Sequence, residues 1–309
     1  AFPLDDFLAQ LDDLHARGAR LFKFVDRTFN LNVKTSQRIM QFFLDKLAAN
    51  PDDPVYAHFE LVPDHLPEAL KETIAQFPAG ALQFEIGIQS FNPEVQALVS
   101  RKQNNEKAAD NIRWLCTQSQ AHLHVDLIAG LPGEDIASFA RGFDQLVGLG
   151  AHEIQFGILK RLRGTPIIRH TGPYRMVYDP YPPYTVLATS LIDFPTMQRL
   201  VRFARYWDLV ANSGRFAHTV NTLLGEAPFA NFMAFSDWIY TKTDATHRIA
   251  LERLAKLVAE WLAVTGMTQE GASALVASDY AGKVDAAHKD KPAAQPVAAP
   301  ARQVRHLAA

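Results

Sequence analysis

Helix and strand patterns alternate through the first half of the chain, and this alternation constrains the fold more than any other feature. Short apolar runs typical of strands lie between segments in which apolar residues recur at helical spacing. The predicted strands are 21–25, 55–61, 82–88, 122–128 and 153–159, and the predicted helices are 7–17, 36–49, 66–77, 105–118 and 137–148. No hairpin signal joins neighbouring strands, so helices must carry the chain from each strand to the next. The sequence therefore predicts an α/β protein with a parallel sheet.

The pattern changes after Thr165. Several prolines and four tyrosines lie between Pro166 and Pro195, which indicates an ordered, loop-rich linker. Helices are predicted again at 196–211, 229–243 and 247–265. From about Gly282 the sequence has no apolar periodicity, which is typical of a disordered tail. We expect three parts: a core at 1–168, a mostly helical domain with a Pro/Tyr-rich linker at 169–281, and a tail at 282–309.

Charge and cysteine content exclude several classes of protein. A net charge of -2 at pH 7 gives no general attraction to nucleic acid or to an anionic membrane. No apolar run approaches the ~20 residues of a membrane span, and the first residues do not resemble a signal peptide, so a cytoplasmic protein is expected. The single cysteine, Cys116, is interpreted as a buried thiol within a helix. His122 and His124 alternate like a metal pair but precede the functional end of their strand, so no metal site is predicted.

Polar side chains gather where the predicted strands end. In a parallel barrel these positions converge on one mouth, where the chemistry is usually found. The candidate binding residues are Asp26, Thr28, Asn30, Glu60, Glu85, Gln89, Ser90, Arg101, Asp126 and Lys160. Other interpretations stay open, because Asp26 and Asn30 could form turn and cap bonds and Glu85 could form a structural pair with Arg101. Asp126 stands among apolar residues in its strand, so it needs a partner inside the protein.

Taken in order, these segments resemble the radical S-adenosylmethionine (SAM) superfamily, and most closely its cobalamin-binding branch. The resemblance covers residues 2–168. It depends on the order of five motifs: Phe24-Val25-Asp26-Arg27-Thr28-Phe29-Asn30, then Glu60, then Glu85-Ile86-Gly87-Ile88-Gln89-Ser90 with the later Arg101, then Asp126 to Glu134, and finally Lys160 with Gly164-Thr165-Pro166.

The resemblance implies a partial (β/α)6 barrel, similar to a TIM barrel with its first strand missing, with SAM lying across the mouth. By similarity, the segment 26–30 would meet the methionine amino group of SAM. Glu60, Gln89, Arg101 and Asp126 match SAM-contacting positions of the related oxygen-independent coproporphyrinogen dehydrogenases. Lys160 would lie near the adenine.

One departure from the superfamily is severe. Its members hold a 4Fe–4S cluster with a Cys-x3-Cys-x2-Cys loop, and this chain has one cysteine. We therefore expect the carboxyl-terminal part of a cobalamin-binding radical SAM enzyme, inactive alone. In its longer form it would use SAM, a 4Fe–4S cluster and cobalamin for a radical methylation, cyclisation or rearrangement of a small-molecule substrate. The alternatives are a non-catalytic scaffold or binding protein, and one half of a split enzyme whose partner chain carries the missing amino-terminal region.

Overall fold

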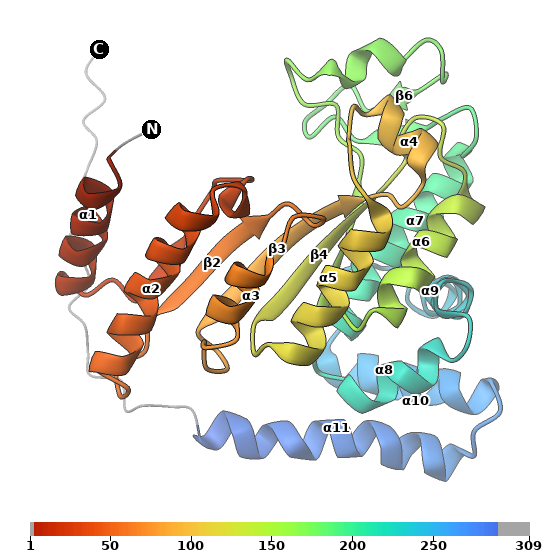
Figure 1. Ribbon diagram of the computed structural model, residues 1–309. Helices are drawn as coiled ribbons and strands as arrows, with labels where there is room; N and C mark the ends of the chain where they lie inside the picture. The colour runs from red at the N-terminus through yellow and green to blue at the C-terminus, as the bar shows by residue number, and fades with distance from the viewer. Residues whose placement is uncertain (1–2, 290–309) are drawn as a thin grey trace, which may run out of the picture.

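Five strands form one parallel sheet in the computed structural model, which describes residues 3–289 (Figure 1). They are β1 (Leu21–Lys23), β2 (Tyr56–Leu61), β3 (Leu82–Gln89), β4 (His122–Ala129) and β5 (Glu153–Ile158), and their spatial order equals their order in the chain. A doubly wound sheet reverses its order at a switch point, whereas a β/α barrel does not. The sheet therefore has the topology of part of a barrel, and the α/β prediction is confirmed.

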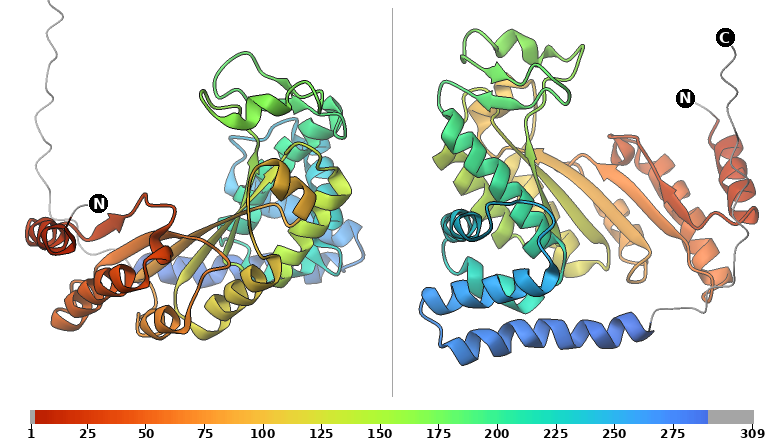
Figure 2. Two further views of the ribbon diagram at one scale, coloured as in Figure 1. Left: turned by 45° about the horizontal axis from the view of Figure 1, so that its top comes forward. Right: turned by 180° about the vertical axis from the view of Figure 1, so that it is seen from behind.

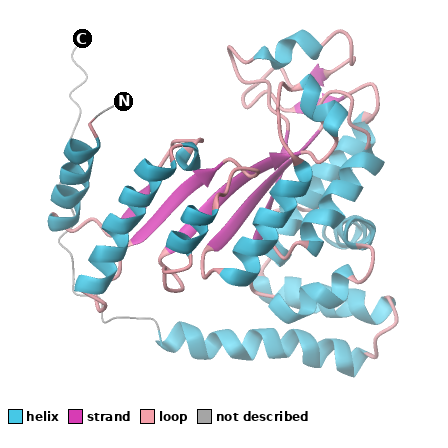
Figure 3. Ribbon diagram, viewed as in Figure 1, coloured by secondary structure: helices cyan, strands magenta, loops and turns pink. Residues whose placement is uncertain are grey.

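Helices connect these strands and cover one face of the sheet (Figures 1 and 3). They are α1 (Leu4–Ala16), α2 (Val33–Ala49), α3 (Glu68–Ile74), α4 (Pro93–Leu98), α5 (Asn105–Gln118) and α6 (Ile136–Gly148), with a 3-10 turn at Phe29–Leu31 before α2. The short helix α4 was not predicted from apolar periodicity. It begins at a polar cap, since the side chain of Asn92 accepts hydrogen bonds from the backbone N–H groups of Glu94 and Val95.

The two faces of the sheet differ in polarity. Burial alternates along β3 and β4, because successive side chains of a strand point to opposite faces. Phe84, Ile86 and Ile88 belong to the apolar core, whereas Glu85 and Gln89 face the other way and are half-buried. Seen from behind in Figure 2, this second face has no helix over β2 and β3. Polar side chains can therefore reach solvent or a ligand there.

Aromatic side chains fill the core at both ends of the sheet. Near β1 and β2, Phe59 stacks on Phe29 with ring centroids 3.9 Å apart. Near β5, Phe156 lies 4.8 Å from Phe203, a residue of the carboxyl-terminal helices. Offset or tilted aromatic pairs of this kind add to the free energy of apolar burial. The carboxyl-terminal helices are thus packed directly onto the sheet.

The second half of the chain is mostly helical. Its helices are α7 (Phe194–Trp207), α8 (Ala217–Leu224), α9 (Pro228–Thr243), α10 (Leu251–Val264) and α11 (Gln269–Lys289), with a 3-10 turn at Pro166–His170 and a π-helical turn at Asp208–Asn212. The linker contains a short antiparallel pair, β6 (Val177–Tyr178) and β7 (Val186–Ala188), which the sequence did not signal. Among the described helices, none is both long and apolar enough to cross a membrane.

The tail predicted from residue 282 needs correction at its start. Helix α11 continues through this boundary to Lys289. The segment is rich in alanine, the residue with the highest helix propensity, so it can be helical without an apolar stripe. The rest of the predicted tail, residues 290–309, lies outside the described part of the chain.

Candidate functional site

A cavity of about 790 Å³ opens at the carboxyl ends of β2 to β5. Six of the ten candidate residues line it: Glu60, Glu85, Gln89, Arg101, Asp126 and Lys160. They come from four strand ends and from the loop before α5, segments far apart in the sequence. Their convergence follows from the parallel sheet, in which all strands end at the same edge.

A β-bulge shapes the wall formed by β3. The pairing of β3 with β4 shifts between Gly87 and Gln89, and Gln89 has a φ of 68°. Gly87 lines the cavity between the side chains of Gln89 and Arg101. A Cβ atom there would overlap the amide of Gln89 and would lie 3.8 Å from Nη2 of Arg101. Gly87 is therefore needed for the close approach of these two side chains, as expected for a glycine within a strand.

Arg101 reaches the cavity from the loop between α4 and α5. Its Nη2 donates a hydrogen bond to the carbonyl oxygen of Gly87, and its Nε donates to Oε1 of Gln103 at 3.0 Å. Burial lowers the pKa of the Arg101 guanidinium, which nevertheless stays charged. No ion pair joins Arg101 to Glu85 within residues 3–289. Glu85 instead contacts Lys23 at 3.4 Å and His58 at 3.3 Å.

Four carboxyl groups, those of Glu60, Asp64, Glu85 and Asp126, line this cavity. The pKa of Asp126 is raised to about 7, mainly by burial and also by the negative charges of Glu85 and Glu60, against the opposing charges of Arg101 and Lys23. Oδ1 of Asp126 is buried without a hydrogen-bond partner among the described residues, and it lies 3.7 Å from Nε2 of His124. An unsatisfied buried carboxyl oxygen is costly, and a ligand with a donor group would satisfy it.

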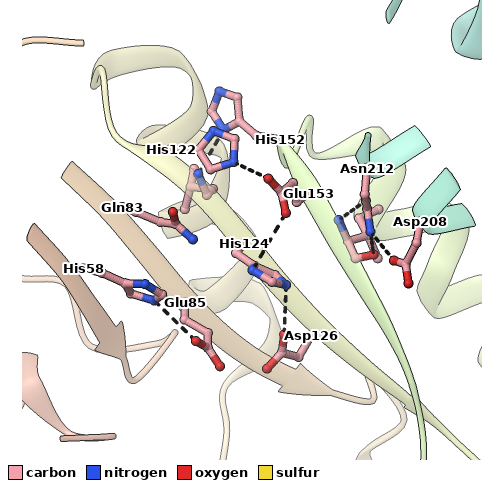
Figure 4. A network of polar contacts seen from close by, with 12 residues as sticks. His58, Gln83, Glu85, His122, His124, Asp126, His152, Glu153, Asp208 and Asn212 are labelled. Carbon is pink, nitrogen blue, oxygen red and sulfur yellow. Dashed lines mark hydrogen bonds and ion pairs between the residues drawn. The ribbon is translucent and has the colours of Figure 1, made fainter. Parts of the chain in front are cut away.

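The polar face continues from the cavity toward the beginnings of the strands, which lie at the top of Figure 4. Glu85, His124 and Glu153 occupy paired positions on three neighbouring strands. His124 lies 4.0 Å from Glu153, and Nε2 of His122 lies 2.9 Å from the same carboxylate. The two histidines therefore share an acidic partner.

The described residues do not provide a site for an iron–sulfur cluster. Between residues 3 and 289, no three His, Cys, Asp or Glu side chains are grouped in a way that could hold a metal ion. Cys116 is half-buried on α5, and burial raises the pKa of its thiol to about 11. Cluster ligands are thiolates and three or four are needed, so the residues present do not fit a 4Fe–4S cluster.

The remaining four candidate residues do not line the cavity. Asp26 accepts hydrogen bonds from the backbone N–H and the hydroxyl of Thr28, at 2.9 and 2.8 Å, and both residues are exposed. Asn30 is fully buried and its side chain binds the backbone of Val62 in both directions, donating at 2.8 Å and accepting at 2.9 Å. Asn30 thus joins the loops after β1 and β2 and positions Val62, which lines the cavity.

Ser90, the fourth, points away from the cavity toward Glu134. Its hydroxyl donates a 2.5 Å hydrogen bond to Oε1 of Glu134 and accepts one from the backbone N–H of Asn92 at 3.0 Å. The pKa of Glu134 is raised to about 7, because the effect of burial exceeds the opposing effect of the hydrogen bond from Ser90. Strand alternation explains this placement, because Ser90 follows Gln89, whose side chain lines the cavity, and successive side chains point to opposite faces.

Several residues that line the cavity were not selected from the sequence. They are Arg27, Val62, Asp64, Lys102, Gln103 and Thr165, all from loops. Arg27 had a weak signal, because it stands between two candidates. Thr165 belongs to the Gly164-Thr165-Pro166 motif but was not selected as a binding residue. The other four had no signal, since loop positions show no periodicity that indicates which side chains turn inward.

Comparison with known proteins gives one family match and several partial matches to curated proteins. Residues 172–293 match a family described as "Protein of unknown function (DUF4080)". Oxygen-independent coproporphyrinogen III oxidase of Paracoccus denitrificans is 28% identical over 95 residues, covering 31% of this chain and 21% of that protein. Anaerobilin synthase of Escherichia coli O157:H7 is 30% identical over 89 residues, covering 29% and 20%.

Among solved structures, coproporphyrinogen III oxidase from Escherichia coli, described as a radical SAM enzyme, has a TM-score of 0.45 and 18% identity, covering 65% of this chain and 45% of that one. The radical SAM methyltransferase TsrM from Kitasatospora setae, with cobalamin and a [4Fe-4S] cluster bound, has a TM-score of 0.49 and 14% identity, covering 91% of this chain and 55% of that one. The chain thus spans about a fifth of the curated relatives and about half of these radical SAM structures.

Proposed function

We propose that the cavity at the strand ends binds SAM, and that this chain is the carboxyl-terminal part of a cobalamin-binding radical SAM enzyme. The observation that carries the proposal is the convergence of Glu60, Gln89, Arg101 and Asp126 on one cavity, at the positions that the sequence resemblance assigns to SAM. The volume of about 790 Å³ is in the range of small-molecule sites.

The polar groups of the cavity suit the groups that SAM carries. Its ammonium, sulfonium and ribose hydroxyl groups need carboxyl oxygens, which Glu60 and the unsatisfied Oδ1 of Asp126 offer. Its carboxylate needs a cation, and Arg101 and Lys160 line the same space. When bound, SAM supplies a methyl or a 5′-deoxyadenosyl group.

The chain's own residues bind and orient the ligand in this proposal. Asp126, with a pKa raised to about 7, holds a proton in part of the molecules at neutral pH, so a cationic ligand favours its ionised form. Because the residues do not fit an iron–sulfur cluster, we assign no electron-transfer step to this chain. We expect it to bind SAM without cleaving it.

Equilibrium dialysis with radiolabelled SAM tests the proposal on the full chain. We expect saturable binding that weakens at least tenfold in Glu60→Gln and Asp126→Asn, because each loses a charge-assisted contact of ~1.5–3 kcal/mol. Glu226→Gln is the matched control, since Glu226 is exposed and does not line the cavity. Absence of saturable binding, or equal affinity in all three variants, would refute the SAM site.

A split enzyme is the second candidate. Among the described residues, β1 has a strand neighbour on one side only, and Leu21 and Val25 are 68% and 80% exposed. An open strand edge can pair with another chain. We propose that a polypeptide carrying the cluster loop would dock here. Native mass spectrometry of the two polypeptides should show a 1:1 complex that Leu21→Glu weakens, and two separate monomers would contradict this candidate.

A further inference from the structure

Beyond Lys160 the chain forms a second hollow next to the first cavity. It has a volume of about 720 Å³ and is lined by Arg161, Leu162, Arg163, Gly164, Thr165, Pro166, Ile168, Pro180 and Tyr184. Thr165 lines both spaces, so one short loop separates them. The Tyr-rich linker supplies the opposite wall.

Backbone hydrogen bonds fix the two walls against each other. The N–H of Arg161 donates to the carbonyl oxygen of Tyr184 at 3.0 Å, and the N–H of Val186 donates to Leu159 at 2.8 Å. The N–H of Leu159 in turn donates to Ala129, the last residue of β4, at 3.0 Å. The hollow is therefore tied to the sheet through continuous main-chain bonds.

Two arginines of this loop lie over tyrosine rings. Cζ of Arg161 lies 4.9 Å from the ring centroid of Tyr178, and Cζ of Arg163 lies 5.9 Å from that of Tyr184. Nη2 of Arg163 also donates a hydrogen bond to the Tyr184 hydroxyl at 3.2 Å. Stacking engages the flat face of a guanidinium, so the N–H groups on its edge remain able to donate.

The two guanidinium groups of this loop have no acidic partner among residues 3–289. No carboxylate lies within 4 Å of Arg161 or Arg163 in the part of the chain that the structure describes. The carboxylate of Asp179, which belongs to the same linker, accepts a 2.9 Å hydrogen bond from the backbone N–H of Tyr181. The positive charges of Arg161 and Arg163 therefore lie at one hollow with no neighbouring carboxylate among the described residues. An oxyanion bound there would neutralise them.

We propose that this hollow is an oxyanion subsite, which binds a phosphate or carboxylate group of a small molecule through Arg161 and Arg163. The planar fork of a guanidinium matches both oxyanions, and two forks held on aromatic rings are preorganised for them. Because the hollow shares Thr165 with the first cavity, a molecule anchored here extends toward that cavity. The subsite is independent of the SAM proposal, since none of its lining arginines contributes to the first cavity.

Isothermal titration of the full chain with inorganic pyrophosphate and, separately, with citrate tests the subsite at constant ionic strength. We expect saturable binding of at least one probe, weakened about tenfold in Arg161→Gln and again in Arg163→Gln. Arg175→Gln is the matched control, because Arg175 is an exposed arginine of the same linker that lines neither hollow.

The two probes distinguish the source of the anion. Preference for pyrophosphate indicates a phosphate group, and preference for citrate indicates a carboxylate. Tyr184→Phe retains the stacking ring and should bind the probes within about twofold of the wild-type chain. Failure of both probes to bind, or equal binding in Arg161→Gln, Arg163→Gln and Arg175→Gln, would overturn the proposal. Thermal unfolding of each variant confirms that the comparison is made on folded protein.

Discussion

Replacing Asp126 with asparagine should change the pH dependence of stability. Its pKa is about 7 in the folded protein and 3.8 in the reference state. Between these values only the folded protein holds the proton, so stability falls as pH rises through this range. The difference of about 3 pKa units lowers the free energy of unfolding by about 4 kcal/mol at pH values above the folded-state pKa. This loss is absent below the pKa of the reference state. Asparagine cannot ionise and avoids this penalty.

Urea unfolding of both proteins from about pH 5 to about pH 8.5 measures the effect. The free energy of unfolding of Asp126→Asn, relative to wild type, should rise by about 3 kcal/mol across this interval, because part of the penalty is already present at the lower end. Contributions of other titrating groups largely cancel in the difference between the two proteins. The variant should be the more stable form at the alkaline end.

Two variants serve as controls for this measurement. Asp110→Asn is the surface control, because it removes an exposed carboxylate of α5 that does not line the cavity. Glu85→Gln removes a charge that raises the pKa of Asp126, so the midpoint of the wild-type transition should move to lower pH. A constant difference between Asp126→Asn and wild type would show that Asp126 is already ionised, and the reasoning would fail.

Three further substitutions test the packing around the site by urea unfolding. In Gly130→Ala the new Cβ would lie 2.6 Å from Val186, so this substitution should destabilise the protein by about 1–3 kcal/mol more than Gly80→Ala. Gly80 is the control because it has a similar φ but open space around it. Equal losses of stability in the two variants would exclude the clash. Asn30→Ala should cost about 3 kcal/mol and Asp26→Ala less than about 1 kcal/mol, because only Asn30 satisfies buried backbone groups. Phe59→Ala should cost about 3–5 kcal/mol, and a loss below about 1 kcal/mol would contradict its place in the core.

The fold of the first half was predictable because the spacing of apolar residues indicates which side chains are buried in a helix or a strand. Segments such as 105–118 and 122–128 have clear apolar patterns, and the structure places a helix and a strand there with nearly the same bounds. Elements without such patterns were missed. Helix α4 depends on a polar cap, and the two-residue strand β6 is too short to show alternation. In α11 alanine content replaced periodicity as the cause of helix formation.

The cavity was predictable to the extent that parallel strands bring their ends together. Glu60, Gln89 and Asp126 were found by this rule. The rule could not separate ligand-facing side chains from those that satisfy the backbone, because both are polar. Asn30 binds main-chain groups, and Ser90 lies on the face opposite Gln89, where it donates to a buried carboxyl group. Such outcomes depend on local register, which the chemical type of a residue does not reveal.

The loop that carries Thr165 separates the two hollows, and this shared wall has a consequence for how they fill. A ligand that displaces this loop from one hollow changes the space and the contacts that the other hollow offers to a second ligand. Occupancy of the two hollows is then coupled, and linkage requires each ligand to change the affinity of the other by the same factor. Titrating one ligand in the presence of the other would measure this factor, and the order of addition would leave it unchanged.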